Sequence, residues 1–172
     1  MESTVRDILQ CEPSHILYTN DLWQITELTV PDDVTTLEDL QHMTYLETLT
    51  LNGRSMSNLN DLSELTHLKK LDLTGCRFSA DSLATVASLP ALQELNLTDC
   101  GLSTLAGLEH ATGLIKLDLT SNTIRNLEPL KDLSRLQEVI LAHNAVTDLT
   151  VLGGLPNLVK LDISHNTVSS LS

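Results

Sequence analysis

Residues 114–144 read LIKLDLTSNTIRNLEPLKDLSRLQEVILAHN, and this stretch decides the fold. The pattern L-x-x-L-x-L-x-x-N ends first at Asn122 and then, 22 residues later, at Asn144, with Val139 in place of one leucine. An internal period of this length indicates an architecture in which each unit packs against its neighbours along the chain. We therefore expect a coil of similar units rather than one irregular core.

The same pattern extends outward from this stretch over most of the chain. Its successive copies are separated by 22, 24, 22, 22 and 22 residues, and a looser copy begins at Ile25. We expect residues 25–172 to form a solenoid of about seven coils, with residues 1–24 as an N-terminal helical cap of the same continuous domain. The six closer copies begin at Leu46, Leu68, Leu92, Leu114, Leu136 and Leu158.

This pattern resembles the leucine-rich-repeat family, and its 22-residue unit is similar to those of bacterial internalins and of the leucine-rich regulator of type-one protein phosphatase. The resemblance implies an α/β fold, a right-handed solenoid with a concave parallel β-sheet. The residues agree, because the L-x-L alternation is strand periodicity with its leucines pointing inward. Between strands, apolar residues at every third position favour short 3₁₀ turns on the convex side, as in Ile124, Leu127, Leu130 and Leu133.

One polar position closes each copy of the pattern. The resemblance implies that its side chain points inward and hydrogen-bonds the backbone of the turn. Asparagine supplies both a donor and an acceptor for that purpose, and we interpret cysteine here as a small apolar substitute. Arg54 departs from the pattern, which predicts an irregular first full coil. This inward column consists of Arg54, Cys76, Cys100, Asn122, Asn144 and Asn166.

The N-terminal segment predicts a helix that covers the first coil. Thr4 and Asp7 have capping-box spacing, and Val5, Ile8 and Leu9 supply an apolar face. The internalin resemblance extends to the segment after Asp21, where a small helical cap leads into the first strand. We interpret Trp23 as a plug inside that cap.

Two other places depart from a uniform coil. The 24-residue unit has room for a genuine helical turn between Phe78 and Ala91, with Ser79 or Asp81 as its cap. At the C-terminus the residues stop about halfway through a repeat, which predicts an exposed apolar end without a cap. We favour a longer protein as the explanation over cover by a partner or self-association through this open end.

Two columns of side chains point outward from the predicted strands. The first alternates in charge, as Lys70, Glu94, Lys116, Glu138 and Lys160. We interpret it mainly as a ladder of ion pairs between neighbouring strands, and secondarily as a binding surface. The second column is the better binding candidate, although simple solvation explains it equally well, and its members are Asp72, Asn96, Asp118, Ile140 and Asp162, flanked by Thr74, Thr98, Thr120 and Ser164.

Composition excludes several classes of partner. The net charge of −13 repels phosphate backbones, so we expect no nucleic acid, and no apolar run is long enough for membrane insertion. Cys11, Cys76 and Cys100 are odd in number and form no zinc-like cluster, which favours a reducing, cytoplasmic location. A secreted or cell-surface location is the alternative if a signal peptide has been removed.

No residue set supports catalysis, a cofactor or a metal. Nucleotide-binding glycine motifs and catalytic triads are absent from the sequence, so we expect no enzyme. His143 and His165 share one position in adjacent coils, and we interpret this as a coincidence of the repeat because a third ligand is missing. We predict a protein–protein interaction module whose concave face binds a basic or polar surface. The alternatives are a regulatory or targeting domain of a larger enzyme or effector, and an internalin-like bacterial surface adhesin.

Overall fold

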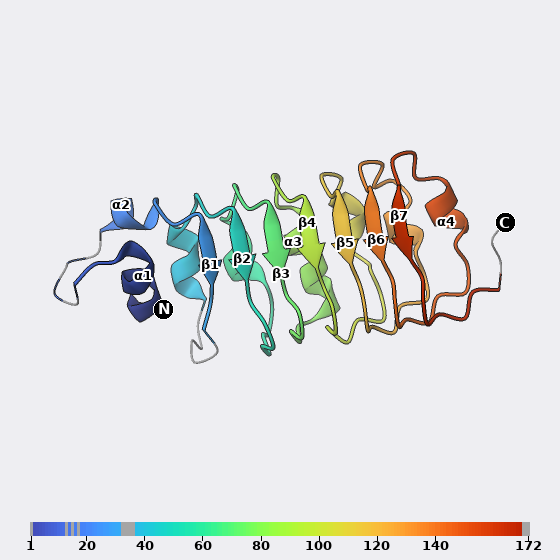
Figure 1. Ribbon diagram of the computed structural model, residues 1–172, viewed down its shortest axis with the longest axis horizontal. Coiled ribbons are helices and arrows are strands. Elements are labelled where there is room, and N and C mark those ends of the chain that lie inside the picture. The colour runs from blue at the N-terminus through green and yellow to red at the C-terminus, as the bar shows by residue number, and fades with distance from the viewer. Residues whose placement is uncertain (1, 13, 15, 17, 32–36, 170–172) are drawn as a thin grey trace.

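A computed structural model describes residues 2–12, 14, 16, 18–31 and 37–169. Its framework is one parallel sheet in which seven short strands follow one another in chain order (Figure 1). Each strand is three residues long. The strands are β1 (Glu27–Thr29), β2 (Thr48–Thr50), β3 (Lys70–Asp72), β4 (Glu94–Asn96), β5 (Lys116–Asp118), β6 (Glu138–Ile140) and β7 (Lys160–Asp162).

Neighbouring strands pair in the register that the repeat predicts. The middle residue of each strand faces the middle residue of the next, as Leu49 faces Leu71 and Leu71 faces Leu95. These leucines are at most 2% exposed, whereas the residues on either side of them point away from the core. The predicted stack of parallel strands is therefore confirmed.

Short turns complete each coil on the side of the molecule opposite the strands (Figure 1). The predicted apolar series is buried there, since Ile124, Leu127, Leu130 and Leu133 are at most 2% exposed. Five of the turns within the described residues are 3₁₀ helices, which confirms that prediction. They are η1 (Glu38–His42), η2 (Asn60–Leu62), η3 (Ala80–Ser82), η4 (Leu108–His110) and η5 (Glu128–Leu130), and two short α-helices, α3 (Leu83–Ala87) and α4 (Thr150–Gly153), join them.

Helix α3 occupies the 24-residue unit, so the extra residues form the helical turn expected there. Of the two predicted caps, Ser79 occupies the N-cap position of η3, although its side chain makes no capping hydrogen bond. Asp81 lies inside η3 and is not a cap. The turn is instead fixed by burial of Leu83 and Val86, both fully inside the core.

The N-terminal segment forms α1 (Glu2–Leu9) and α2 (Thr19–Leu22). Helix α1 packs on the first coil through Val5, which is 3% exposed, and through Leu9, whereas Ile8 is 42% exposed. The helix begins at Glu2, so Thr4 lies within it and the predicted capping box at Thr4 is wrong; the Thr4 side chain lies outside the described residues.

Trp23 is 49% exposed, so it is not the buried plug that its sequence position predicted. Strand β7, at the other end of the described sheet, is less covered than the inner strands. Leu161 of β7 is 38% exposed, whereas the equivalent Leu117 of β5 is 1% exposed, because no further described coil packs against β7. Val159 beside it is 83% exposed.

Candidate functional site

The candidate site is the outward sheet face, which we define as the two columns of side chains that flank the buried middle residues of β1–β7. Strand register places the members of each column side by side. A shallow groove of about 350 Å³ lies over the central strands of this face. The first column is Glu27, Thr48, Lys70, Glu94, Lys116, Glu138 and Lys160, and the second is Thr29, Thr50, Asp72, Asn96, Asp118, Ile140 and Asp162.

The first column forms the predicted ladder of ion pairs. Glu94 Oε1 lies 3.3 Å from Lys70 Nζ and 3.8 Å from Lys116 Nζ, so one carboxylate serves two strands. Lys160 Nζ lies 2.6 Å from Glu138 Oε1, and that hydrogen bond and charge raise the pKa of Lys160. The positive and negative charges in this column therefore largely neutralise one another. The first column contributes little to the electrostatic potential of the outward sheet face.

The second column has a structural task that the sequence interpretation missed. Asp72 Oδ1 accepts hydrogen bonds from the Thr74 N–H at 2.9 Å and from the Thr74 hydroxyl at 2.6 Å. Asp118 and Thr120 form the same two bonds at the same distances. Each aspartate thus closes a tight turn at the end of its strand. The hydroxyls of Thr74 and Thr120 donate to these carboxylates, so they are less available to a binding partner.

Asp162 repeats this turn at the end of β7. The N–H of Ser164 donates to Asp162 Oδ1 at 2.9 Å. The N–H and the hydroxyl of Ser164 lower the pKa of Asp162, with smaller contributions from His165 and His143. The carboxylate is therefore held in its charged form at the end of the column.

Two members of the second column that lie between its aspartates carry no charge. Asn96 makes the same backbone bond as its neighbours, because Asn96 Oδ1 accepts from the Thr98 N–H at 2.9 Å. Ile140 is half-buried and has no polar group to close such a turn. An amide can therefore replace a carboxylate here without loss of the turn.

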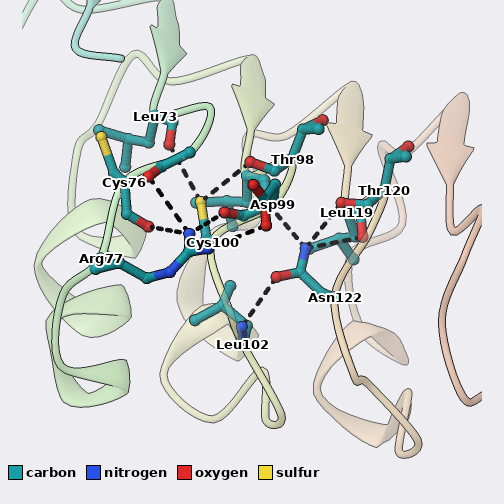
Figure 2. Close-up of polar contacts among 12 residues, drawn as sticks. Leu73, Cys76, Arg77, Thr98, Asp99, Cys100, Leu102, Leu119, Thr120 and Asn122 are labelled. Carbon is teal, nitrogen blue, oxygen red and sulfur yellow. Dashed lines mark hydrogen bonds and ion pairs between the residues drawn. The ribbon is translucent and has the colours of Figure 1, made fainter. Parts of the chain in front are cut away.

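The inward column holds the coils together on the other side of the strand ends (Figure 2). Asn122 Nδ2 donates to the carbonyls of Leu97 at 2.8 Å, Leu119 at 2.9 Å and Thr120 at 3.2 Å. Asn122 Oδ1 accepts from the Leu102 N–H at 2.9 Å. Both ends of the amide are thus used, as predicted. Asn144 and Asn166 make the equivalent bonds in the next two coils.

The two cysteines of this column are hydrogen-bonded rather than merely apolar, which corrects the sequence interpretation. Cys76 Sγ lies 2.6 Å from the Leu51 carbonyl. Cys100 Sγ lies 3.1 Å from the Leu73 carbonyl (Figure 2). Burial raises the pKa of Cys76 and raises that of Cys100 to about 12. Both thiols are therefore neutral donors that take over the donor half of the asparagine.

Arg54 also takes over this role. Its guanidinium donates to the Val30 carbonyl at 2.7 Å and to the Pro31 carbonyl. The first full coil therefore departs from the pattern in residue type but keeps the bond from the column to the preceding coil.

An exposed aromatic ladder is a second surface feature that the sequence interpretation missed. The ring centroids of Trp23 and Tyr45 are 6.0 Å apart, and those of Tyr45 and His67 are 5.0 Å apart and stacked. Trp23 is 49% and Tyr45 47% exposed. Their spacing of 22 residues was the available signal, because side chains one period apart become neighbours in a solenoid.

Two negative findings apply to the described part of the chain. No helix there has the length and apolar character needed to cross a membrane. The same residues hold no group of three or more His, Cys, Asp or Glu side chains placed to hold a metal ion.

Stacked in-register strands, short convex turns and an inward hydrogen-bonding column are the features of a leucine-rich-repeat solenoid, and the chain has this fold. Family models of leucine-rich repeats match residues 64–87 and, as two copies, residues 134–172. No curated protein sequence matches the chain. Proteins of this class are protein-binding scaffolds, and the fold of this chain fits a protein–protein interaction module.

Within that class the protein is internalin-like. An internalin (inlF) from Listeria monocytogenes superposes with a TM-score of 0.87 at 25% identity, over 99% of this chain and 50% of its own. Internalin C2 from the same species gives a TM-score of 0.87 at 28% identity, over 98% and 75%. The functional domain of InlJ from Listeria monocytogenes, which includes a cysteine ladder, shares the fold with a TM-score of 0.68 at 21% identity, over 91% and 34%. The chain thus spans half the length of the first of these structures.

Proposed function

We propose that the chain binds a protein with a basic or polar contact surface through the second column of the outward sheet face. The observation that carries this proposal is the difference between the two columns. Lysines and glutamates of the first column pair with one another. Within the described residues, no ion pair is formed by Asp72, Asp118 or Asp162.

The electrostatics of the whole chain support the same partner. A net charge of −13 attracts basic surfaces over a distance of about 10 Å at moderate salt, and a column of fixed carboxylates directs that attraction to one face. Because the carboxylates are held by their own turns, little ordering is needed on binding. Ile140 is the apolar contact point of the second column. We expect moderate affinity with a strong dependence on salt.

The test is a triple variant, Asp72→Asn/Asp118→Asn/Asp162→Asn. Asn96 already shows that an amide keeps the turn, so this variant removes three charges and leaves the fold intact. The matched control is Asp39→Asn/Asp61→Asn/Asp132→Asn, three exposed acids outside the sheet. A partner is captured from cell extract, identified, purified and titrated against each variant.

We expect the sheet variant to lose at least about tenfold in affinity, equivalent to 1.4 kcal/mol, and the control variant to keep the wild-type affinity. The wild-type complex should also weaken steeply as salt rises. Equal binding by both triple variants would show that the second column is not the contact surface.

Two alternatives concern the wider protein. A regulatory or targeting domain of a larger enzyme or effector, or an internalin-like surface adhesin, is supported by the greater length of the matched internalins. The coding sequence on both sides of these residues discriminates them. A catalytic domain alongside the repeats favours the first, and an export signal with a surface anchor favours the second.

Three further parts of the proposal have their own support. We propose that residues 1–24 cap the solenoid of residues 25–172, because Val5 is buried against the first coil. A reducing, cytoplasmic location is supported by the free thiols of Cys11, Cys76 and Cys100, with a secreted location as the alternative.

Self-association through the open end is supported by exposed Leu161. Light scattering of wild type and Leu161→Asn tests that last part, since only the wild type should dimerise.

A further inference from the structure

Two histidines stack on each other where strands β6 and β7 end. His143 and His165 follow Ile140 and Asp162 by three residues, and those two residues are partners across the strands. The ring centroids are 4.0 Å apart and the ring planes differ by 9°. Both side chains are exposed. The register of the repeat therefore brings two accessible imidazoles together.

The backbone fixes where these two side chains begin. The position before the inward column has a positive φ in six coils, a backbone conformation that side chains other than that of glycine rarely adopt. His143 and His165 share a φ of 55°, and the His143 N–H donates to the Ser164 carbonyl at 3.0 Å. Both rings therefore leave the backbone in the same direction. The six residues are Gly53, Gly75, Asp99, Ser121, His143 and His165.

We propose that His143 and His165 form a two-histidine site for a divalent transition-metal ion, with Cu²⁺ bound more tightly than Ni²⁺ or Zn²⁺. Imidazole nitrogen is a preferred ligand of all three ions, and the usual order of affinity places Cu²⁺ first. With metal–nitrogen bonds of about 2.0–2.1 Å, neighbouring ligand atoms lie about 3 Å apart. In the stacked arrangement the two rings face each other, so to bind one ion they must turn out of the stack until one nitrogen of each points at it. Both side chains are exposed, with ring centroids 4.0 Å apart.

Two protein ligands leave the other coordination positions open to water or to a donor from another molecule. The sequence interpretation rejected a metal because a third ligand is missing, and the described residues indeed contain no group of three. An exchangeable site needs only two. The carboxylate of Asp162 interacts electrostatically with both rings, and its negative charge favours a bound cation.

The experiment is a titration of the tag-free chain with Cu²⁺ at neutral pH, followed by calorimetry and electron paramagnetic resonance. The variants are His143→Asn and His165→Asn, because asparagine tolerates a left-handed backbone. The matched control is His110→Asn, an exposed histidine of η4. A parallel titration with Ni²⁺, which does not oxidise thiols, provides a second ranking.

We expect one ion per wild-type chain, with two nitrogen ligands in the resonance spectrum. Each single variant should weaken binding by at least about tenfold, since loss of even an outer partner of a ligand costs roughly 10–100-fold. Circular dichroism should show wild-type folding in every variant. Wild-type affinity in either His143→Asn or His165→Asn, or an equal loss in His110→Asn, would overturn the proposal. The outcome is independent of the outward sheet face, because the probe is the metal alone.

Discussion

Replacement of Asn122 by alanine should be among the most damaging single changes in the chain. The Asn122 side chain is 7% exposed, and its amide makes four hydrogen bonds of 2.8–3.2 Å. Alanine removes all of them and leaves the Leu97 carbonyl and the Leu102 N–H without this partner inside the solenoid. One buried polar group left unpaired costs about 1–3 kcal/mol. We expect a loss of about 3–5 kcal/mol for Asn122→Ala.

Asn122→Cys separates the two halves of the amide. A thiol can donate to a carbonyl, as Cys100 does to Leu73 at 3.1 Å, but it does not replace the amide oxygen for the Leu102 N–H. The cysteine variant should therefore lose about 1–3 kcal/mol, less than the alanine variant. The control is Asn52→Ala, an exposed asparagine, which should change stability by no more than about 0.5 kcal/mol.

The assay is urea unfolding followed by circular dichroism, with hydrogen exchange to find which coils open first, because repeat proteins can lose cooperativity. In Asn122→Ala, exchange should accelerate first in the coils that contain Leu97 and Leu119. A loss below about 1 kcal/mol for Asn122→Ala, or equal losses for the alanine and cysteine variants, would refute the reasoning that the inward column acts through both its donor and its acceptor.

Two further predictions concern a glycine and a thiol. Gly107→Ala should destabilise the chain by more than about 2 kcal/mol, because φ at this residue is 99° and an added Cβ would lie 2.8 Å from the Ala84 backbone nitrogen. Gly153→Ala, where an added Cβ meets nothing within 4 Å, should be neutral or stabilising, and urea unfolding of both variants measures the difference. The pKa of Cys100 is about 12 in the folded chain against 9.0 without burial, so the unfolded thiol loses its proton first. Its stabilisation is full below pH 9.0 and is lost between pH 9.0 and about 12. As the pH rises from 9.0 toward about 12, Cys100→Ala should therefore lose less stability than wild type. Thiol alkylation at about pH 8 should modify Cys11 well before Cys100, and equal rates would contradict the burial of that thiol.

The parallel sheet and its register could be predicted because the same pattern recurs in several aligned copies. Six aligned copies place Leu71 beside Leu95 whatever the local propensity of either segment, and the ion pairs of Glu94 follow from that alignment. Burial of Ile124 and Leu127 follows from the three-residue spacing in the same way. Features that recur in every coil can therefore be predicted reliably from such a sequence.

Features that belong to single positions were harder to predict. Gly53 and Gly75 are a sequence signal for a backbone position with positive φ. The equivalent position is occupied by His143 in a later coil, and histidine gives no such signal. The turn made by Asp72 competes with its interpretation as a free charge, and only geometry shows that Thr74 is bonded to it. Cysteine was treated as apolar because its weak donor capacity is realised only when a carbonyl lies within reach.

The proposed binding surface and the inward hydrogen bonds between coils lie on different sides of the same strand ends. Turn closure in the second column requires only an oxygen at the right place, which aspartate and asparagine supply equally, as Asp118 and Asn96 show. Even that requirement is relaxed in β6, where Ile140 holds the position without such an oxygen. The core beneath is fixed separately by the inward column, with Asn144 bonded to the preceding coil at 2.8 Å. Charge and shape on the outward sheet face can therefore change from coil to coil while the coils stay in register, and this independence suits a binding surface.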